Sequence, residues 1–530
     1  MAYTPDGQTI KVSFDNRAEA VAAYIRDEID YIFVGDLLYV KDVGGTALPT
    51  NGNTVNWSPP PSHITPQHWI ENTTPGTTDM TSAILSACTF ASAISDSAGA
   101  RSQRPEVNMR GERMGISETD VTYGGVLVTD LNGFTLRNGQ LEAIGTWTAT
   151  GADQALLYLR GNAALLTHVT VKDITFECDR KTGAITFDNC RSCAGSDIVG
   201  HGFIKHGLSS ITKNSSFYGH NIDMQEWLIT DSGSDIQSNR VASGFKWETA
   251  DGKLVNCKAQ LCNKNFERSD IGYNCMLVNC HFWNGYAQGG TEDPETIYNM
   301  YIDEPKNLLI SNLYADTGVL YINADALDSG VGDFLSITGA MHVRLGTGVI
   351  GAGPQIIIHT TTANNDLAGL HLISNLFNEQ ADNIKFTTAG SGSWATNLKW
   401  TFWDCVQFDG TDVTQTGYPT TGTTTALPQS MAGRLRIDSN NALTIGRSGD
   451  AIVQATSSLD LDADYGSTSA AANREVRLGN RGTSHLVVRS DGTLYAPSLS
   501  TYADNAAAVT GGLAVGEIYQ TSAGALRIRV

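Results

Sequence analysis

A short motif recurs along the middle of the chain: an apolar residue, any residue, asparagine, and a second apolar or small residue. It occurs in LVNCKA (254–259), LVNCHF (277–282), ISNLYA (310–315) and ISNLFN (373–378). With Asp in place of Asn, or Gly in place of the second apolar residue, the pattern also fits VKDITF (171–176), FDNCRS (187–192), FWDCVQ (402–407) and LRNGQL (136–141). The steps are irregular: Leu277 follows Leu254 by 23 residues, and Ile310 follows Leu277 by 33. The next copy lies 63 residues after Ile310, which is about two such steps.

An irregular period of about 20–35 residues, with short β segments and an Asn at a fixed place, is typical of a parallel β-helix. In this fold each coil contributes short strands that pair with the coils before and after it. Asn tolerates the left-handed backbone conformation of a sharp turn between strands, and its amide can bond to the Asn one coil away. The sequence therefore predicts a mainly β protein whose central part is a parallel β-helix.

The segment PGTTDMTSAILSAC (75–88) predicts one short amphipathic helix, with Asp79 as its N-cap. Its small and apolar residues recur at the spacing of one buried helix face: Met80, Ala83, Ile84, Ala87, Cys88 and Ala91. The first coil of a β-helix exposes unpaired strand edges and an apolar interior. We therefore expect this helix to cover the beginning of the β-helix.

The composition excludes several classes of partner. The formal net charge is −20, and such a field repels phosphate backbones, so we expect no nucleic-acid partner. No stretch approaches the roughly 18 apolar residues of a membrane span, and no basic segment precedes an apolar one at the N-terminus. We expect neither membrane insertion nor export by a signal peptide.

The nine cysteines permit two interpretations. Three pairs have close spacing, Cys190/Cys193, Cys257/Cys262 and Cys275/Cys280, which is compatible with zinc binding. However, the spacings differ, and Cys190, Cys257, Cys275 and Cys280 directly follow Asn. We expect reduced, buried thiols that act as small apolar side chains, with no metal and no cofactor.

Several segments resemble phage tailspike and tail fibre proteins. PGTTDMTSAILSAC is similar to the Asp-rich segment that opens their pectate-lyase-like β-helix, and ITPQHWIE (64–71) resembles the segment before it. FDNRAEAVAAYIRDEIDYIFVGDLLYVKDVGGTAL (14–48) is similar to the N-terminal module of tail proteins from alphaproteobacterial phages and prophages. VVRSDGTLYAP (487–497) and YADNAAAVTGGLAVGEIYQTSAGALRIRV (502–530) resemble the closing segment of such fibres.

This resemblance implies a domain order: a virion-attachment module (1–70), a right-handed parallel β-helix with its cap helix (71–415), a linker (416–430) and a β-rich tip (431–530). In the first module we expect a small helix with Val21, Tyr24, Ile25 and Ile29 on one face, followed by strands at 31–34 and 37–41. The tip strands are too short and polar to close a core alone, which favours intertwining in a homotrimer. A small monomeric β-sandwich is the alternative.

The resemblance also implies a function. We expect a protein of the virion tail that attaches to a tail or baseplate protein through its N-terminal module and recognises a host surface polysaccharide through its β-helix. Whether it also cleaves the polysaccharide, as a hydrolase or a lyase, stays open. Two alternatives remain: a non-enzymatic tail component that uses the β-helix as a spacer, and a free bacterial polysaccharide lyase.

The region 223–304 is richest in acidic and aromatic residues, the types that cleave and bind glycans. Carboxylates on adjacent coils, about 4.8 Å apart, would suit the roughly 5–5.5 Å separation of a retaining glycosidase. The catalytic candidates are Glu248, Asp251, Glu292, Asp293 and Glu295. The glycan-binding candidates are Trp227, Trp247, Trp283 and Tyr286. The alternative is that the acidic loops are ordinary solvated loops and that some of the tryptophans belong to the core.

Overall fold

The structure is a computed structural model. It describes residues 12–25, 29–42, 47–49, 56–97, 104–148, 150–212, 216–227, 240–248, 250–268, 274–284, 297–303, 305–326, 334–343, 354–361, 368–378, 383–389, 399–408, 413, 415–416, 430–431, 434–435, 475–480, 483–489, 494–495, 501–514, 518–523 and 526–528. The chain divides into two compact units, Met1–Leu443 and Thr444–Val530.

A small four-stranded sheet precedes the β-helix. It consists of β1 (Val12–Phe14), β2 (Tyr31–Val34), β3 (Leu37–Asp42) and β4 (Asn56–Ser58), with α1 (Arg17–Ala22) beside it. Ile32, Tyr39 and Trp57 belong to its own buried cluster. The expected strands at 31–34 and 37–41 are confirmed. The expected helix face is corrected: α1 ends at Ala22, so only Val21 of the four residues lies on it. Ile25 and Ile29 are buried beyond its end, and Tyr24 is 65% exposed.

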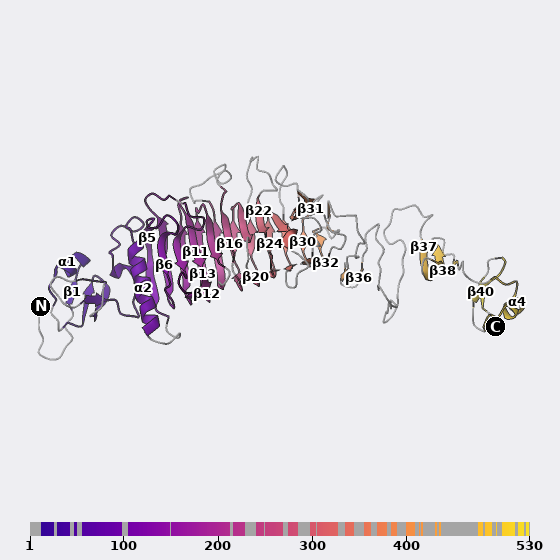
Figure 1. The fold of residues 1–530 in the computed structure, drawn as a ribbon, viewed down its shortest axis with the longest axis horizontal. Coiled ribbons are helices and arrows are strands. Elements are labelled where there is room, and N and C mark those ends of the chain that lie inside the picture. The colour runs from indigo at the N-terminus through magenta and orange to yellow at the C-terminus, as the bar shows by residue number, and fades with distance from the viewer. Residues whose placement is uncertain are drawn as a thin grey trace. The chain divides into compact units, whose positions relative to one another are not determined.

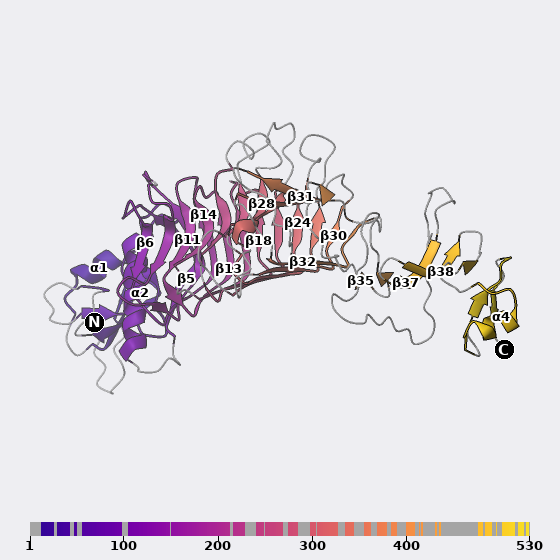
Figure 2. The ribbon, with the colours of Figure 1, turned by 45° about the vertical axis from the view of Figure 1, so that its right-hand side comes forward.

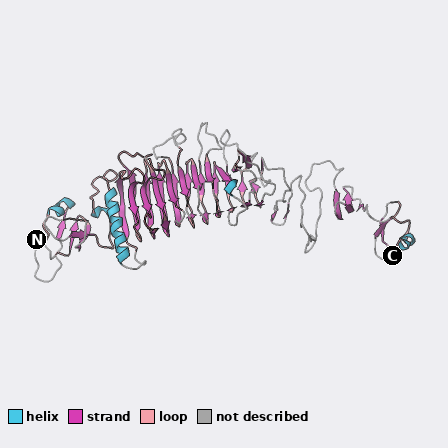
Figure 3. Cartoon of the chain, in the orientation of Figure 1, coloured by secondary structure: helices cyan, strands magenta, loops and turns pink. Residues whose placement is uncertain are grey.

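Three parallel sheets form the β-helix, and Figures 1 and 3 show their strands stacked coil upon coil. Five long, bent strands begin both the first and the second sheet: β5 (Glu106–Ile116), β7 (Thr135–Ala143), β10 (Thr170–Glu177), β13 (Cys193–His201) and β15 (Phe217–Gln225). The first sheet continues with β17 (Lys253–Val255), β20 (Cys275–Val278), β23 (Leu308–Ser311), β26 (Leu335–Thr338), β29 (Ala368–Ile373) and β32 (Lys399–Trp403). The second sheet continues with β18 (Lys258–Gln260), β21 (His281–Trp283), β24 (Tyr314–Asp316), β27 (Met341–Val343), β30 (Leu376–Phe377) and β33 (Val406–Gln407).

The third sheet has eleven strands, one from each coil: β6 (Gly124–Thr129), β8 (Ala155–Arg160), β11 (Gly183–Asp188), β14 (His206–Ile211), β16 (Ser243–Trp247), β19 (Lys264–Arg268), β22 (Tyr298–Ile302), β25 (Val319–Asn323), β28 (Ile356–Thr360), β31 (Ile384–Thr388) and β34 (Gln415–Thr416). Two short strands, β9 (Leu166–Thr167) and β12 (Cys190–Arg191), pair at a turn. All pairings within these sheets are parallel, so the predicted parallel β-helix is confirmed.

On each of the ten coils after the first, one residue forms the corner between the first and second sheets in the left-handed conformation, and on the first coil Arg110 and Gly111 do so. The corner residues of the ten later coils are Asn138, Asp173, Asp197, Asn221, Asn256, Asn279, Asn312, Gly339, Ser374 and Asp404. The Asn279 amide donates to the side chain of Asn256 at 3.3 Å, and the Asn312 amide donates to Asn279 at 3.0 Å. The predicted asparagine ladder is therefore confirmed.

Two copies of the motif differ from this arrangement. In ISNLFN the corner residue is Ser374, and the neighbouring Asn375 is buried instead, with its amide bonded to the carbonyl of Ile337. In FDNCRS, Asn189 takes the left-handed conformation at a different turn, after the third sheet. The coil that separates ISNLYA from ISNLFN has Gly339 at its corner, where glycine adopts positive φ without strain.

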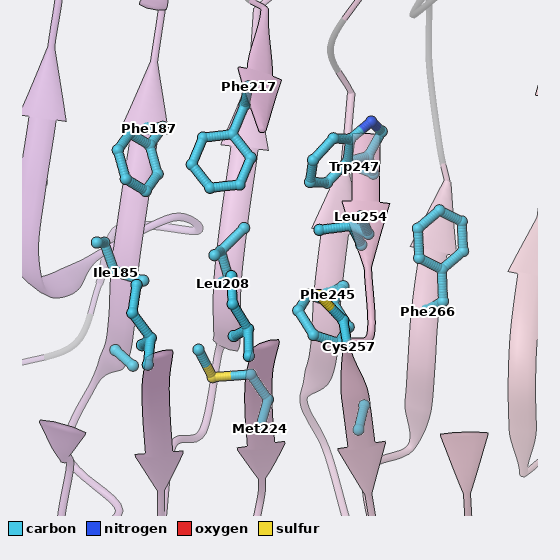
Figure 4. Packing of buried hydrophobic residues seen from close by; sticks show 14 of the residues in the cluster. Ile185, Phe187, Leu208, Phe217, Met224, Phe245, Trp247, Leu254, Cys257 and Phe266 are labelled. Carbon is cyan, nitrogen blue, oxygen red and sulfur yellow. The ribbon is translucent and has the colours of Figure 1, made fainter. Parts of the chain in front are cut away.

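The interior of the β-helix is one continuous apolar core. Figure 4 shows Phe187, Phe217 and Trp247 side by side in the interior, with ring centroids 4.4 and 5.5 Å apart in a tilted and an edge-on contact. All nine cysteines are unpaired and buried, and Cys257 and Cys280 lie at the inner corners of consecutive coils, as expected for an internal ladder. The described residues contain no group of three or more His, Cys, Asp or Glu side chains arranged to hold a metal ion.

The helix α2 (Thr81–Ser97) covers the first coil next to β5 and β6, as Figure 2 shows. The six small and apolar residues of the predicted helix face are all fully buried. Asp79 accepts a hydrogen bond from the backbone N–H of Thr81 at 3.0 Å. The chain approaches so closely that a Cβ on Gly115 would lie 2.8 Å from the Thr78 carbonyl oxygen. The predicted cap is confirmed. A short 3-10 helix, η1 (Pro66–His68), packs beside it.

The remaining elements are short. Within the first unit these are η2 (Ala324–Ala326), β35 (Ser430–Met431) and β36 (Arg434–Leu435). The second unit contains antiparallel strands and one helix: β37 (Glu475–Asn480), β38 (Thr483–Arg489), β39 (Leu494–Tyr495), α4 (Asn505–Thr510), β40 (Ile518–Gln520) and β41 (Leu526–Ile528). Among the described residues, no helix combines the length and apolarity needed to span a membrane. The domain boundaries at 70, 415 and 430 stay predictions.

Candidate functional site on the outer face of the second sheet

Two columns of side chains follow the outer face of the second sheet. On each coil they come from the positions two and four residues after the corner residue, and the residue between them is buried. Parallel register aligns these positions one above another, about 4.8 Å apart. We call the following eight residues the second-sheet face: Asp223, Gln225, Lys258, Gln260, His281, Trp283, Tyr314 and Asp316.

Asp223 organises one end of this face. Its carboxylate accepts a hydrogen bond from the Gln260 amide at 3.1 Å and another from the Gln225 amide at 3.2 Å. The ammonium group of Lys258 lies 3.8 Å from the same carboxylate. Two amides and one cation are thereby fixed around a single acceptor.

Aromatic rings occupy the other end of the face. The rings of His281 and Tyr314 lie 4.6 Å apart, and the Tyr314 hydroxyl donates to Asp316 at 3.4 Å. Thr317 donates a second hydrogen bond to Asp316, at 2.6 Å. Burial lowers the pKa of His281 below its usual 6.5, and the charge of Lys258 lowers it further. The imidazole is therefore neutral at pH 7.

Two tryptophans offer flat apolar surface beside these polar groups. Trp283 is a member of the face. Trp227 lies two residues after Gln225, and its indole N–H donates a hydrogen bond to the side-chain oxygen of Gln225 at 2.7 Å. Both are half-buried, and no aromatic ring in the described part of the chain stacks on either indole. On the third sheet, by contrast, Tyr301 and Tyr321 stack at 4.9 Å and cover each other's faces.

The structure brings together only some of the predicted site residues. Trp227 and Trp283 lie at the second-sheet face. Glu248 lies at the end of the third sheet and pairs with Lys246 at 3.1 Å. Asp251 is exposed in the turn before the first sheet and accepts a hydrogen bond from Asn274 at 3.1 Å. Four predicted residues lie outside the described residues: Tyr286, Glu292, Asp293 and Glu295.

Trp247 requires a correction. It is 1% exposed, and its indole N–H points to the sulfur of Cys275 at 3.1 Å. A side chain in the core has no ring face available to a sugar, so Trp247 is part of the packing, as the alternative reading allowed. A tryptophan at the end of a buried strand could not be assigned to either side from the sequence alone.

Most residues of the second-sheet face were not predicted as site residues from the sequence: Asp223, Gln225, Lys258, Gln260, His281, Tyr314 and Asp316. A signal for them was present in the repeat itself. In LVNCKAQ and LVNCHFW the second and fourth residues after Asn are the outward positions, because alternation along a strand fixes their side.

Glu226 lies next to this face in sequence but points inward, and it is 1% exposed. Its carboxylate accepts hydrogen bonds from the backbone N–H groups of Val241 at 2.5 Å, Ala242 at 3.1 Å and Asn263 at 3.2 Å. Burial raises the pKa of Glu226 to about 8, although these hydrogen bonds lower it. The side chain fixes the returning chain and does not reach the surface.

No known protein family matches the sequence, and no curated protein matches it. Several solved structures are similar to it. Geobacillus virus E2 ORF18 is 10% identical, with 99% of each chain covered and a TM-score of 0.41. The tailspike gp49 of Acinetobacter baumannii bacteriophage Fri1, a capsular polysaccharide depolymerase, is 12% identical, with 74% of this chain and 72% of that chain covered and a TM-score of 0.39.

The A-module of the Azotobacter vinelandii mannuronan C-5 epimerase AlgE4 is 11% identical, with 62% of this chain and 97% of that chain covered and a TM-score of 0.33. At this level of similarity, none of these structures assigns a residue, a substrate or an activity to this chain.

Proposed function

We propose that this protein is a phage tailspike or tail fibre that recognises a host cell-surface polysaccharide through its second-sheet face. The observation that carries the proposal is the pair Trp227 and Trp283, which flank the amide and carboxylate groups held around Asp223. Flat apolar rings beside fixed donors and acceptors suit sugar rings, which have apolar faces and hydroxyl edges. Repetition of these groups from coil to coil suits a ligand that is itself a repeating chain.

The geometry supports binding better than cleavage. Glycoside hydrolysis requires a carboxylic acid that holds a proton near the scissile oxygen. Glu226 has a pKa raised to about 8, but its side chain is buried and bonded to the backbone. Asp223 and Asp316 lie on the face, and each already accepts hydrogen bonds from neighbouring side chains. We therefore propose recognition as the primary function and keep hydrolysis or lysis of the polysaccharide as an outcome of the test.

We further propose that residues 1–70 attach the protein to a phage tail or baseplate protein and that residues 431–530 hold it as a homotrimer in the virion tail. The separate core of the four-stranded sheet supports an independent module. Within residues 1–70, Arg17 joins the sheet to the 3-10 helix η1 through a hydrogen bond to the His68 carbonyl at 2.6 Å. The short antiparallel strands of the second unit support a tip that gains stability from identical copies.

The test is binding of the purified protein to surface polysaccharides extracted from a panel of candidate host bacteria. Truncation of an aromatic hot spot typically costs about 2 kcal/mol, so Trp283→Ala and Trp227→Ala should each weaken binding by about thirtyfold. Tyr24→Ala is the matched control, because Tyr24 is an exposed aromatic residue on the N-terminal module. New reducing ends or unsaturated uronate absorbance in the same mixtures would add cleavage to the function.

Two results would count against the proposal. Equal binding by Trp283→Ala and the unaltered protein would place recognition elsewhere on the molecule. Adsorption of the protein's phage to hosts whose polysaccharide the purified protein does not bind would favour the spacer alternative.

A further inference from the structure

The outer face of the first sheet carries a strip of exposed and half-buried apolar side chains, interrupted by uncharged polar ones. It begins on β15 and extends to β29 in two columns that parallel register aligns. We call these residues the first-sheet strip: Tyr218, Val255, Met276, Val278, Leu309 and Ile373. The exposed fractions of Tyr218, Met276 and Leu309 are 45%, 39% and 37%. Exposed apolar side chains gathered on one face of a protein indicate a candidate interaction surface.

The strip is poor in charge. From β15 to β29, Lys253 is the one Lys, Arg, Asp or Glu in the two columns among the described residues, and the other positions are His, Ser, Thr or apolar. On the preceding coils the same columns carry Arg137 and Lys172. The change from charged to apolar residues therefore takes place along one face of one continuous sheet.

We propose that the first-sheet strip packs against the same strip of a second copy of this chain, with the β-helices side by side. The inference rests on the homotrimer of the proposed function and names the part of the β-helix through which its copies meet. Each copy carries a net charge of −20, so copies repel one another except where the facing surfaces are uncharged. The strip is such a surface.

Repetition also favours a second copy over other partners. The side chains recur at the coil spacing of about 4.8 Å, and an identical strip placed alongside presents ridges and grooves of the same spacing. A lipid surface is a poorer fit, because anionic headgroups attract clusters of Lys and Arg and the strip has a single Lys253 among its columns. The strip runs for about 25 Å over the coils from β15 to β29. It would supply part of the contact surface between copies, and the tip strands would supply the remaining surface.

Cysteine cross-linking of the full chain tests the proposal. The nine native cysteines are all buried, so an added surface cysteine would be the reactive one. The variants are Leu309→Cys and Met276→Cys, and the control is Val121→Cys, at an exposed apolar residue before β6 that is 55% exposed. Sedimentation measures the mass of each protein, mild oxidation followed by denaturing electrophoresis detects covalent dimers, and maleimide labelling measures accessibility.

We expect each protein to sediment as a trimer. Both strip variants should form covalent dimers on oxidation, whereas Val121→Cys should run as a single chain in denaturing electrophoresis. The strip cysteines should react with maleimide at least tenfold more slowly than the cysteine of Val121→Cys. A trimer in which the strip cysteines do not cross-link and label as fast as the control would overturn this inference and leave the trimer intact. A monomer at micromolar concentration would overturn the trimer itself, and the inference with it.

Discussion

The corner residues carry much of the information for this fold. A left-handed backbone conformation costs an ordinary L-residue about 1 kcal/mol or more, and Asn, Asp and Gly adopt it most readily. Nine of these ten corners are Asn, Asp or Gly, and Ser374 is the exception. The side-chain amides then link coil to coil, so one residue type both shapes the turn and joins it to its neighbour.

Asn279 allows the two contributions to be separated. Asn279→Ala removes the hydrogen bonds to Asn256 and Asn312 and forces alanine into the left-handed region, so it should lower the free energy of unfolding by about 2 kcal/mol. Asn279→Gly removes the same hydrogen bonds without backbone strain and should lose about half as much. Urea denaturation measures both. Equal losses would show that backbone strain at this corner is negligible.

Three buried histidines predict acid sensitivity. Burial lowers the pKa of His68, His206 and His342 from 6.5 to about 4, so the folded protein binds fewer protons than the unfolded chain between these values. The contribution of the neutral imidazoles to the free energy of unfolding is therefore fully present above pH 6.5 and is lost as the pH falls towards 4. The melting temperature should fall over this range. In His342→Gln the fall should be smaller, and an equal fall would contradict the assignment for that residue.

At the scale of the elements, α2 decides how the β-helix begins. Strand edges and apolar side chains of the first coil would otherwise face water, and the fully buried side of the helix covers them. Neighbouring residues on this helix have opposite environments: Ile84 is fully buried, whereas Leu85 is 36% exposed.

This contrast supplies a matched pair of substitutions. Ile84→Ala should lower the free energy of unfolding by about 2–5 kcal/mol, because it leaves a cavity between the helix and the first coil. Leu85→Ala removes a similar volume from a partly exposed position and should cost well under 1 kcal/mol. Thermal and urea unfolding measure the difference. Similar losses would indicate that α2 does not close the core.

The elements also show what the sequence could and could not predict. Asn256, Asn279 and Asn312 were predictable as corners, because few residues accept that conformation and their spacing repeats. The environment of Trp247 was not predictable, because the strand's two sides cannot be told apart until its partners are known. The site was harder still: Asp223 and Trp283 come from coils two apart and are brought to the same face only through the register.

At the scale of the whole molecule, the net charge of −20 predicts which class of glycan the proposed recognition would favour. Long-range repulsion from an acidic protein disfavours acidic polysaccharides and leaves neutral ones unaffected. Affinity for a neutral polysaccharide should therefore stay within about twofold when salt rises from about 0.05 M to about 0.5 M, and affinity for an acidic one should increase. Titration of a binding partner at several salt concentrations measures this. Binding that weakens steadily with salt would point to a basic recognition surface.

The corners recur at irregular intervals of 23 to 35 residues, yet corner side chains on neighbouring coils still meet, as in Asn221 with Asp197, Asn279 with Asn256 and Asn312 with Asn279. The extra residues are therefore accommodated in the turns between sheets, where they leave the corner and its stacking unchanged. An insertion, deletion or replacement in such a turn can therefore leave the rest of the fold unchanged. Differences in length between related sequences should therefore fall in the turns, and the corner residues should vary least.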